Sequence, residues 1–77
     1  MKIQVEIFGQ LTDITKDKTV EITTVEDTDG LLQKLYEQFP ALRSASFVIA
    51  VNNNLIHGNT GLENNNTVAL MPPYSGG

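Results

Sequence analysis

The residues with the clearest potential for chemistry form the end of the chain, Met71-Pro72-Pro73-Tyr74-Ser75-Gly76-Gly77. Proline holds φ at about −65° and has no backbone N–H, so Pro72 and Pro73 predict the end of a strand and a stiff, extended exit. The last six residues would reach about 20 Å at ~3.3–3.6 Å per residue. Because Gly76 and Gly77 lack Cβ, this tip would fit a slot too narrow for other residues. We therefore expect the Gly77 carboxylate to be a group presented to another protein's active site.

An idle tail is the competing interpretation of residues 72–77. Glycine makes up about 7% of an average protein, so a Gly-Gly ending also arises by chance. Chain ends are, in addition, the segments least often held by packing. The Pro72-Pro73 pair and the regular pattern of the preceding residues favour a functional tail over an idle one.

Composition excludes several classes of function. The chain has 77 residues, enough for one domain, and no cysteine, so it has no disulfide, thiolate nucleophile or cysteine metal site. Its net charge of −4 argues against a nucleic-acid partner. The first residues alternate charged and aliphatic types, unlike a signal peptide, and the longest apolar run, residues 47–51, is too short to span a membrane. We expect a cytoplasmic protein that binds neither nucleic acid nor membrane.

Other chemically capable side chains do not form a site. His57 is the one histidine and falls in a turn-rich stretch, so we expect an exposed residue and no metal site. Glu26, Asp27 and Asp29 suit the start of a helix better than a catalytic carboxylate pair. Residues 57–61 contain two glycines but no lysine and no strand–loop–helix setting, so they predict no phosphate loop. We expect no bound cofactor, no metal and no catalytic set.

The elements that would hold the tail begin with a hairpin. Residues 2–8 alternate, with Ile3, Val5 and Ile7 on one face and Phe8 on the polar face. Residues 10–17 are expected to be a connection, and residues 18–24 a second strand with Val20 and Ile22 facing inward.

One main helix follows the hairpin. Its apolar stripe, at three- and four-residue spacing, consists of Leu31, Leu32, Leu35, Tyr36 and Phe39. Asp27 is the expected N-cap, with Thr24 as an alternative start, and Pro40 ends the helix. Residues 40–46 are then expected to be a loop.

The remaining strands complete a sheet. In residues 47–51 the expected inward set is Phe47, Ile49 and Val51. Asn52-Asn53-Asn54 forms a turn, and residues 55–56 form a very short strand. Leu62 is expected to reach the core from a turn-rich stretch. Residues 67–71 form the last strand, with Val68 and Leu70 inward and Ala69 and Met71 outward.

This order of elements predicts an α+β fold: a mixed sheet of four to five strands with one main helix packed on one face. A right-handed crossover through the helix would leave the first and last strands adjacent and parallel, which is the β-grasp arrangement of ubiquitin-like proteins. We expect residues 1–71 to form this domain and residues 72–77 to form an extended tail ending in Gly-Gly.

An apolar patch would then lie on the open face of the sheet, beside the root of the tail. Its expected members, and so the expected partner interface, are Phe8, Val48, Ala50, Ala69 and Met71. Scattered apolar residues on a surface are ordinary, whereas a contiguous patch usually marks an interface.

The whole chain resembles the small subunit of molybdopterin synthase, a ubiquitin-like sulfur-carrier family. The most specific element is the ending Val68-Ala69-Leu70-Met71-Pro72-Pro73-Tyr74-Ser75-Gly76-Gly77, which is similar to that family's Pro-Pro-x-Ser/Thr-Gly-Gly terminus. Supporting elements are Ile7-Phe8-Gly9, Ile49-Ala50-Val51-Asn52 and Leu62-Glu63-Asn64-Asn65-Asn66-Thr67-Val68. Two departures are Tyr74, where the family commonly has valine, and Asn65, where many relatives have a turn glycine that asparagine can replace.

The resemblance implies a non-catalytic, sulfur-donating subunit. A ubiquitin-activating-type enzyme would use ATP to adenylate Gly77, and a sulfur donor protein would convert the adenylate to a thiocarboxylate. Residues 72–76, Pro72, Pro73, Tyr74, Ser75 and Gly76, would insert into the large synthase subunit, where sulfur passes to a cyclic pyranopterin precursor. The family assembles as a heterotetramer with two large subunits.

Three alternatives remain at this point. A thiazole-pathway (thiamine) sulfur carrier shares the fold and the terminus but usually lacks the Pro-Pro pair. A ubiquitin-like modifier would be joined to lysines of other proteins through Gly77. A β-grasp binding module with an idle tail would need no terminal chemistry at all.

Overall fold

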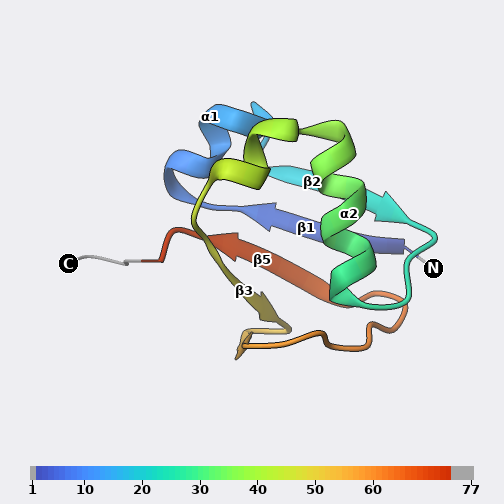
Figure 1. Ribbon diagram of the computed structural model, residues 1–77. Helices are drawn as coiled ribbons and strands as arrows, with labels where there is room; N and C mark the ends of the chain where they lie inside the picture. The colour runs from blue at the N-terminus through green and yellow to red at the C-terminus, as the bar shows by residue number, and fades with distance from the viewer. Residues whose placement is uncertain (1, 74–77) are drawn as a thin grey trace.

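The structure, a computed structural model, describes residues 2–73 and shows one five-stranded sheet with helices on one side (Figure 1). The strand order is β2-β1-β5-β3-β4. In chain order the elements are β1 (Lys2–Ile7), the 3₁₀ turn η1 (Gly9–Leu11), α1 (Thr12–Thr15), β2 (Thr19–Thr23), α2 (Thr28–Gln38), the 3₁₀ turn η2 (Pro40–Ser44), β3 (Val48–Val51), β4 (Asn54–Ile56) and β5 (Thr67–Met71).

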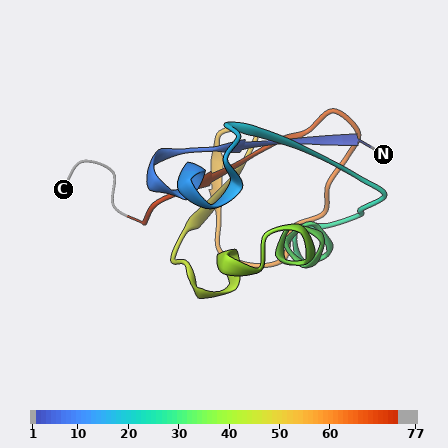
Figure 2. The same ribbon diagram turned by 90° about the horizontal axis from the view of Figure 1, so that it is seen from above.

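The centre of the sheet is a parallel pair formed by the first and last strands. β1 pairs with β5 from Gln4 opposite Thr67 to Ile7 opposite Leu70, while β1–β2, β3–β4 and β3–β5 are antiparallel. Parallel neighbours need a crossover, and the segment containing α2 provides it. Figure 2 shows α2 and η2 as a layer on one side of the sheet. The predicted β-grasp arrangement is confirmed.

The core lies between the sheet and α2, and its members follow from the two periodicities of the sequence. Ile3, Val5 and Ile7 of β1 are at most 3% exposed, and Val68 and Leu70 of β5 are fully buried. On the facing helix, Leu31 and Leu35 are fully buried. Burying each such side chain contributes about 1.5–3 kcal/mol. Leu62 is 5% exposed, so its expected place in the core is also confirmed.

Residues 10–17, which were expected to be a connection between strands, contain helical structure instead. Residues 9–15 form η1 and the one-turn helix α1, with Leu11 and Thr15 each 3% exposed. The helix ends at Lys16, which has a left-handed φ of 67°. The segment is too short for a helical stripe, so its two apolar residues that pack on the core, Leu11 and Ile14, gave no periodic signal.

The expected loop 40–46 is likewise partly helical. Pro40 starts η2, a position where its fixed φ suits a helix and its missing N–H costs nothing. Leu42 is fully buried, and Arg43 lies over the Tyr36 ring, 5.0 Å from its centre. These contacts fold the segment back onto α2, which the sequence pattern of a single leucine did not indicate.

The asparagine turn between β3 and β4 is confirmed. Asn52 and Asn53 have φ of 49° and 69°, and positive φ at both central residues is the requirement of a type I′ hairpin turn. Asn52 also ties the hairpin to β5, because its N–H donates to the Thr67 carbonyl at 2.8 Å and its Oδ1 accepts from the Thr67 N–H at 2.9 Å.

The start of α2 is capped twice. Asp27 is the N-cap, as predicted, and its Oδ1 accepts from the Gly30 N–H at 2.9 Å. A second, unpredicted cap comes from the loop after β4: Asn59 Oδ1 accepts from the Asp29 N–H at 2.8 Å. Asn59 Nδ2 also donates to Asp27 Oδ2 at 3.2 Å, so the two caps hold each other. Together they satisfy N–H groups that a helix start leaves without a partner.

The same loop is fastened to α2 through Thr28. The Thr28 side chain is 2% exposed, and its hydroxyl accepts from the Thr60 N–H at 2.9 Å and donates to Asn59 Oδ1 at 3.3 Å. The Thr28 N–H in turn donates to the Thr60 carbonyl at 2.9 Å. A long connection between β4 and β5 is therefore held by polar contacts at the beginning of the helix.

This capping arrangement makes stability depend on pH. The hydrogen bond from Gly30, followed by that from Asn59, lowers the pKa of Asp27 below its ordinary value. The unfolded chain therefore binds the proton more readily, so ionised Asp27 stabilises the fold above about pH 3.9, and this contribution is lost as pH falls through the lowered pKa.

Asp27→Asn keeps an oxygen for the Gly30 N–H but removes the charge and the oxygen that accepts from Asn59 Nδ2. We expect it to lower Tm at pH 7 and to lower it less at pH 2.5, as circular dichroism can measure. Asp27→Ala, which also removes the hydrogen bond, serves as the control, and its further loss of Tm relative to Asp27→Asn should be similar at both pH values. An Asp27→Asn deficit of equal size at the two pH values would contradict the assignment.

Candidate functional site

The candidate site begins where β1 and β5 end side by side. Pro72 follows β5 directly and is half-buried, whereas Pro73 is exposed. Tyr74, Ser75, Gly76 and Gly77 lie outside the described residues, so their roles stay predictions. Figure 1 shows β1 and β5 pointing toward the same end of the molecule, where the tail starts.

The ladder between the two central strands continues past β1 and places Phe8 beside the root of the tail. The Phe8 N–H donates to the Leu70 carbonyl at 3.0 Å, one step beyond the last paired residues, Ile7 and Leu70. Continuing the register brings Phe8 next to Met71, as the sequence analysis expected. The Phe8 side chain is 44% exposed.

The pairing of β3 with β4 and β5 places further apolar residues on this open face. Met71 lies opposite Val48, Ala69 lies opposite Ala50, and Ala50 lies opposite Leu55 on its other side. Directly opposed residues share a face of the sheet. We define the outer-face patch as Phe8, Val48, Ala50, Leu55, Ala69 and Met71.

Within residues 2–73, the exposed large hydrophobic side chains are Phe8 and Leu55, at 44% and 57%. Both belong to the outer-face patch. An apolar patch that is contiguous across several strands is the usual signature of a protein–protein interface. The half-buried Glu6, opposite Ala69 in the register, adds an acidic group at the border of the patch.

Two members of the patch differ from expectation. Ala50 was expected to be an exposed contact but is only 4% exposed, because its single methyl group sits in mid-sheet between the neighbours on β4 and β5. It forms the floor of the patch. Leu55 was missed, although a signal existed: a two-residue turn at Asn52-Asn53 sets the pairing that puts Leu55 opposite Ala50.

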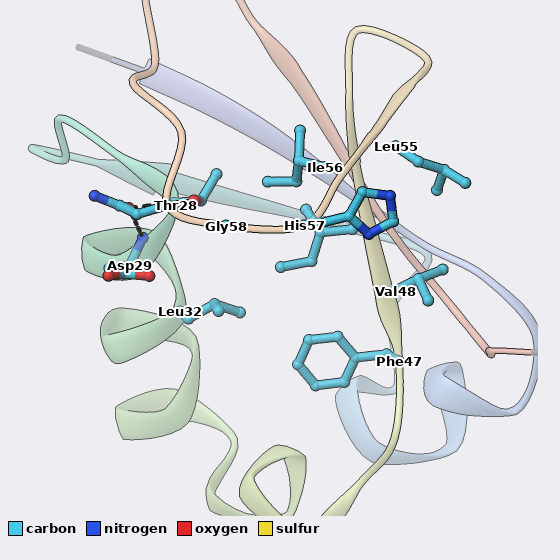
Figure 3. Close-up of a pocket in the computed structure, with 11 residues that line it drawn as sticks. Thr28, Asp29, Leu32, Phe47, Val48, Leu55, Ile56, His57 and Gly58 are labelled. Carbon is cyan, nitrogen blue, oxygen red and sulfur yellow. Dashed lines mark hydrogen bonds between the residues drawn. The ribbon is translucent and has the colours of Figure 1, made fainter.

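A separate hollow lies on the helix side of the sheet. It is a groove of about 350 Å³ between the start of α2 and the β3–β4 hairpin. Figure 3 shows Leu32 and Phe47 pointing into it, while Val48 and Leu55 lie on the other side of β3. His57 borders the groove and is exposed. The hollow carries no arrangement of side chains that suggests chemistry.

Among residues 2–73, no three His, Cys, Asp or Glu side chains gather closely enough to hold a metal ion. The helices formed by these residues are also too short and too polar to cross a membrane. What the geometry shows is an apolar face continuous with the start of the tail.

Comparison with known proteins agrees with this geometry. Three solved structures are similar to the chain. A complex of subunits 1 and 2 of molybdopterin-converting factor from Helicobacter pylori contains a chain that is 28% identical to this one. The two superpose with a TM-score of 0.75, and 100% of each chain is covered. The small archaeal modifier protein SAMP1 from Haloferax volcanii matches at 21% identity and TM-score 0.83, also over 100% of both chains. SAMP1 from Methanosarcina acetivorans matches at 22% and 0.84, over 99% of this chain and 96% of its own.

The two SAMP1 likenesses show the fold, and the Helicobacter pylori complex shows a protein of this shape assembled with a second subunit. The sequence itself matches the model of the ThiS family over residues 5–77, nearly its entire length. The resemblance to ubiquitin-like carrier proteins drawn from the sequence is therefore confirmed. This chain belongs to the ThiS family.

Proposed function

We propose that this protein is the sulfur-carrying small subunit of a molybdopterin synthase. The observation that carries the proposal is the continuity of two features. The outer-face patch, with Phe8 and Met71 at its edge, borders Pro72, where the Pro-Pro-Tyr-Ser-Gly-Gly ending begins. A partner that covers the patch would have the tail entering it from the rim of the same interface.

The chemistry requires activation because a carboxylate is a poor electrophile. A ubiquitin-activating-type enzyme transfers AMP from ATP to the Gly77 carboxylate, and pyrophosphate leaves. A sulfur donor protein then supplies sulfide, so that a C–S bond forms as the bond from carbon to the AMP oxygen breaks. The product is a thiocarboxylate at Gly77, and AMP leaves.

Sulfur delivery takes place in the large subunit. The thiocarboxylate sulfur would form a C–S bond to a carbon of the cyclic pyranopterin precursor as a carbon–oxygen bond at that carbon breaks and the oxygen substituent leaves. Water would then hydrolyse the acyl–sulfur bond, which leaves sulfur on the precursor and restores the Gly77 carboxylate. Two such cycles supply a dithiolene. The chain has no cysteine, so its own side chains offer no alternative sulfur carrier. This protein supplies and positions the group, and the large subunit supplies catalysis within a heterotetramer.

The Helicobacter pylori structure supports the large-subunit partner, because it contains a chain similar to this one within a complex of subunits 1 and 2 of molybdopterin-converting factor. The Pro72-Pro73 pair favours this pathway over the thiazole pathway, whose carriers usually lack it. A deletion strain separates the two: we expect loss of molybdenum-enzyme activity, whereas a thiamine requirement would support the thiazole pathway.

A ubiquitin-like modifier is the second candidate, favoured by the likeness to SAMP1, a modifier protein by name, from two organisms. Both functions begin with adenylation of Gly77 and differ in the acceptor. A modifier predicts branched Gly-Gly remnants on lysines of other proteins after protease digestion, and a carrier used only for sulfur predicts none.

The first test is the intact mass of the protein after incubation with the activating enzyme, ATP and a sulfur donor. We expect a species heavier by one oxygen-to-sulfur exchange, with fragment ions that locate the exchange at Gly77. A variant lacking Gly77 is the control and should keep its mass while retaining its Tm. If the intact protein also stays unchanged under these conditions, sulfur transfer is excluded and lysine conjugates become the leading explanation.

The second test concerns docking. Leu55→Glu places a charge in the outer-face patch, and because Leu55 is 57% exposed the fold should tolerate it. We expect the dissociation constant for the molybdopterin synthase large subunit, measured by calorimetry, to rise about 10-fold or more, as for an interface hot spot.

Gln33→Glu on the exposed side of α2 is the matched control, since it adds the same charge on the opposite layer. Its dissociation constant should stay within about twofold of wild type, as is usual for a residue outside an interface. Equal affinities of the Leu55→Glu variant and the wild type would show that the partner binds elsewhere.

A further inference from the structure

Gly9 makes an unusually close approach to the root of the tail. Its φ is +59°, in the left-handed region that favours glycine. An ideal Cβ placed on Gly9 would lie 2.8 Å from Pro72 Cγ and 3.3 Å from Pro72 Cδ. The first distance is shorter than real Cβ contacts, so the Pro72 ring packs directly against backbone that only glycine leaves bare.

Gly9 is held firmly on its own side of this contact. The preceding residue is in the ladder, since the Phe8 N–H donates to the Leu70 carbonyl at 3.0 Å. The Gly9 carbonyl accepts from the Thr12 hydroxyl at 2.9 Å. Leu11, in the same 3₁₀ turn, is 3% exposed and anchors η1 in the core. The η1 turn is therefore held in place by contacts with both the sheet and the core.

Pro72 is equally constrained on the other side. It follows Met71, the last residue of β5, and its φ is set by the ring. The ring atoms Cγ and Cδ cannot rotate away as the end of a long side chain can. A methyl group at position 9 would therefore press on a ring that is bonded to the backbone at both ends, so we expect η1 or the start of the tail to shift.

We propose that Gly9 is a positioning residue for the tail: its contact with the Pro72 ring sets the direction in which the chain leaves the sheet relative to the outer-face patch. This inference rests on the proposed function. The patch determines how tightly a partner binds, and the Gly9–Pro72 contact determines where Gly77 is delivered once the partner is bound. A misplacement of about 1 Å can lower a reaction rate by about 10²-fold without weakening binding.

Gly9→Ala combines two effects that must be separated. One is backbone strain at positive φ, which does not depend on residue 72. The other is overlap with the Pro72 ring, which disappears when Pro72→Ala removes Cγ and Cδ. A double-mutant cycle of Gly9→Ala and Pro72→Ala therefore isolates the contact. Gly61→Ala is the matched control, because a Cβ there would meet no atom within 4 Å.

The experiment uses thiocarboxylated protein prepared by thiolysis of an intein fusion, so that loading does not depend on the activating enzyme. Single-turnover sulfur transfer is measured at saturating large subunit with the cyclic pyranopterin precursor, and the dissociation constant is measured separately. We expect Gly9→Ala to slow the saturated rate about 10- to 100-fold while affinity stays within about twofold. In the Pro72→Ala background, Gly9→Ala should cost little further rate, and Gly61→Ala should behave as wild type.

Several outcomes would overturn the proposal. A Gly9→Ala rate equal to wild type removes any positioning role. The same rate loss in the Pro72→Ala background assigns the effect to backbone strain. A weaker affinity with an unchanged saturated rate makes Gly9 part of the docking surface. If Gly9→Ala fails to fold, Gly9→Asn replaces it, because asparagine tolerates positive φ yet carries the same Cβ.

If wild-type protein transfers no sulfur, the proposed function fails while the positioning contact can still be judged. Residual dipolar couplings of the Cα–Hα bonds of Pro72 and Pro73 report the orientation of the tail root relative to the sheet. We expect Gly9→Ala to change them and the double variant to match Pro72→Ala. Couplings that are the same in Gly9→Ala and wild type would overturn the positioning role independently of any activity.

Discussion

The parallel pairing of β1 with β5 is the constraint on which the rest of the structure depends. Joining the first and last strands side by side brings together residues more than sixty positions apart, such as Val5 and Val68. Parallel strands cannot be joined by a tight turn, so the chain between them must leave the sheet and return. The amphipathic helix α2 makes that return possible, because its apolar stripe covers the face that the two strands would otherwise expose.

The same pairing brings the root of the tail and the turn after β1 to one end of the molecule. Parallel strands end at the same edge, so the turn that follows β1 and the prolines that follow β5 meet there. Gly9 and Pro72 are in contact although they are far apart in sequence. The face away from α2 carries Ala50, Ala69, Val48 and Met71 on β3 and β5, with the half-buried Glu6 of β1 at their border. A binding face and a tail root become continuous through strand order alone.

Much of this could be predicted from the sequence, because the relevant signals are periodic or local. The alternation of Ile3, Val5 and Ile7 defines a strand face, and Asp27 is a typical N-cap residue. The tail motif points to its chemistry without any fold.

What the sequence could not show depends on contacts between distant segments. Leu11, together with Ile14, and Leu42 attach short helical turns to the core, and these turns are too short to show a periodic pattern. The sequence alone predicts only a loop at Asn59. Its capping role depends on the start of α2 lying beside that loop in the fold. The burial of Ala50 and the exposure of Leu55 follow from register, which is known only once the turn between them is assigned.

The two edge strands of the sheet matter because the protein exposes apolar side chains on one face of that sheet. β4 is an edge strand of only three residues, Asn54–Ile56. β2, at the opposite edge, carries Glu21, whose Oε2 lies 3.6 Å from Nζ of Lys2 on the neighbouring strand. Long, flat and uncharged edges invite another chain to add a strand and so begin aggregation, whereas a short edge or a charged one discourages it. The protein can therefore display Phe8 and Leu55 on its face while its short or charged edge strands disfavour pairing with another chain.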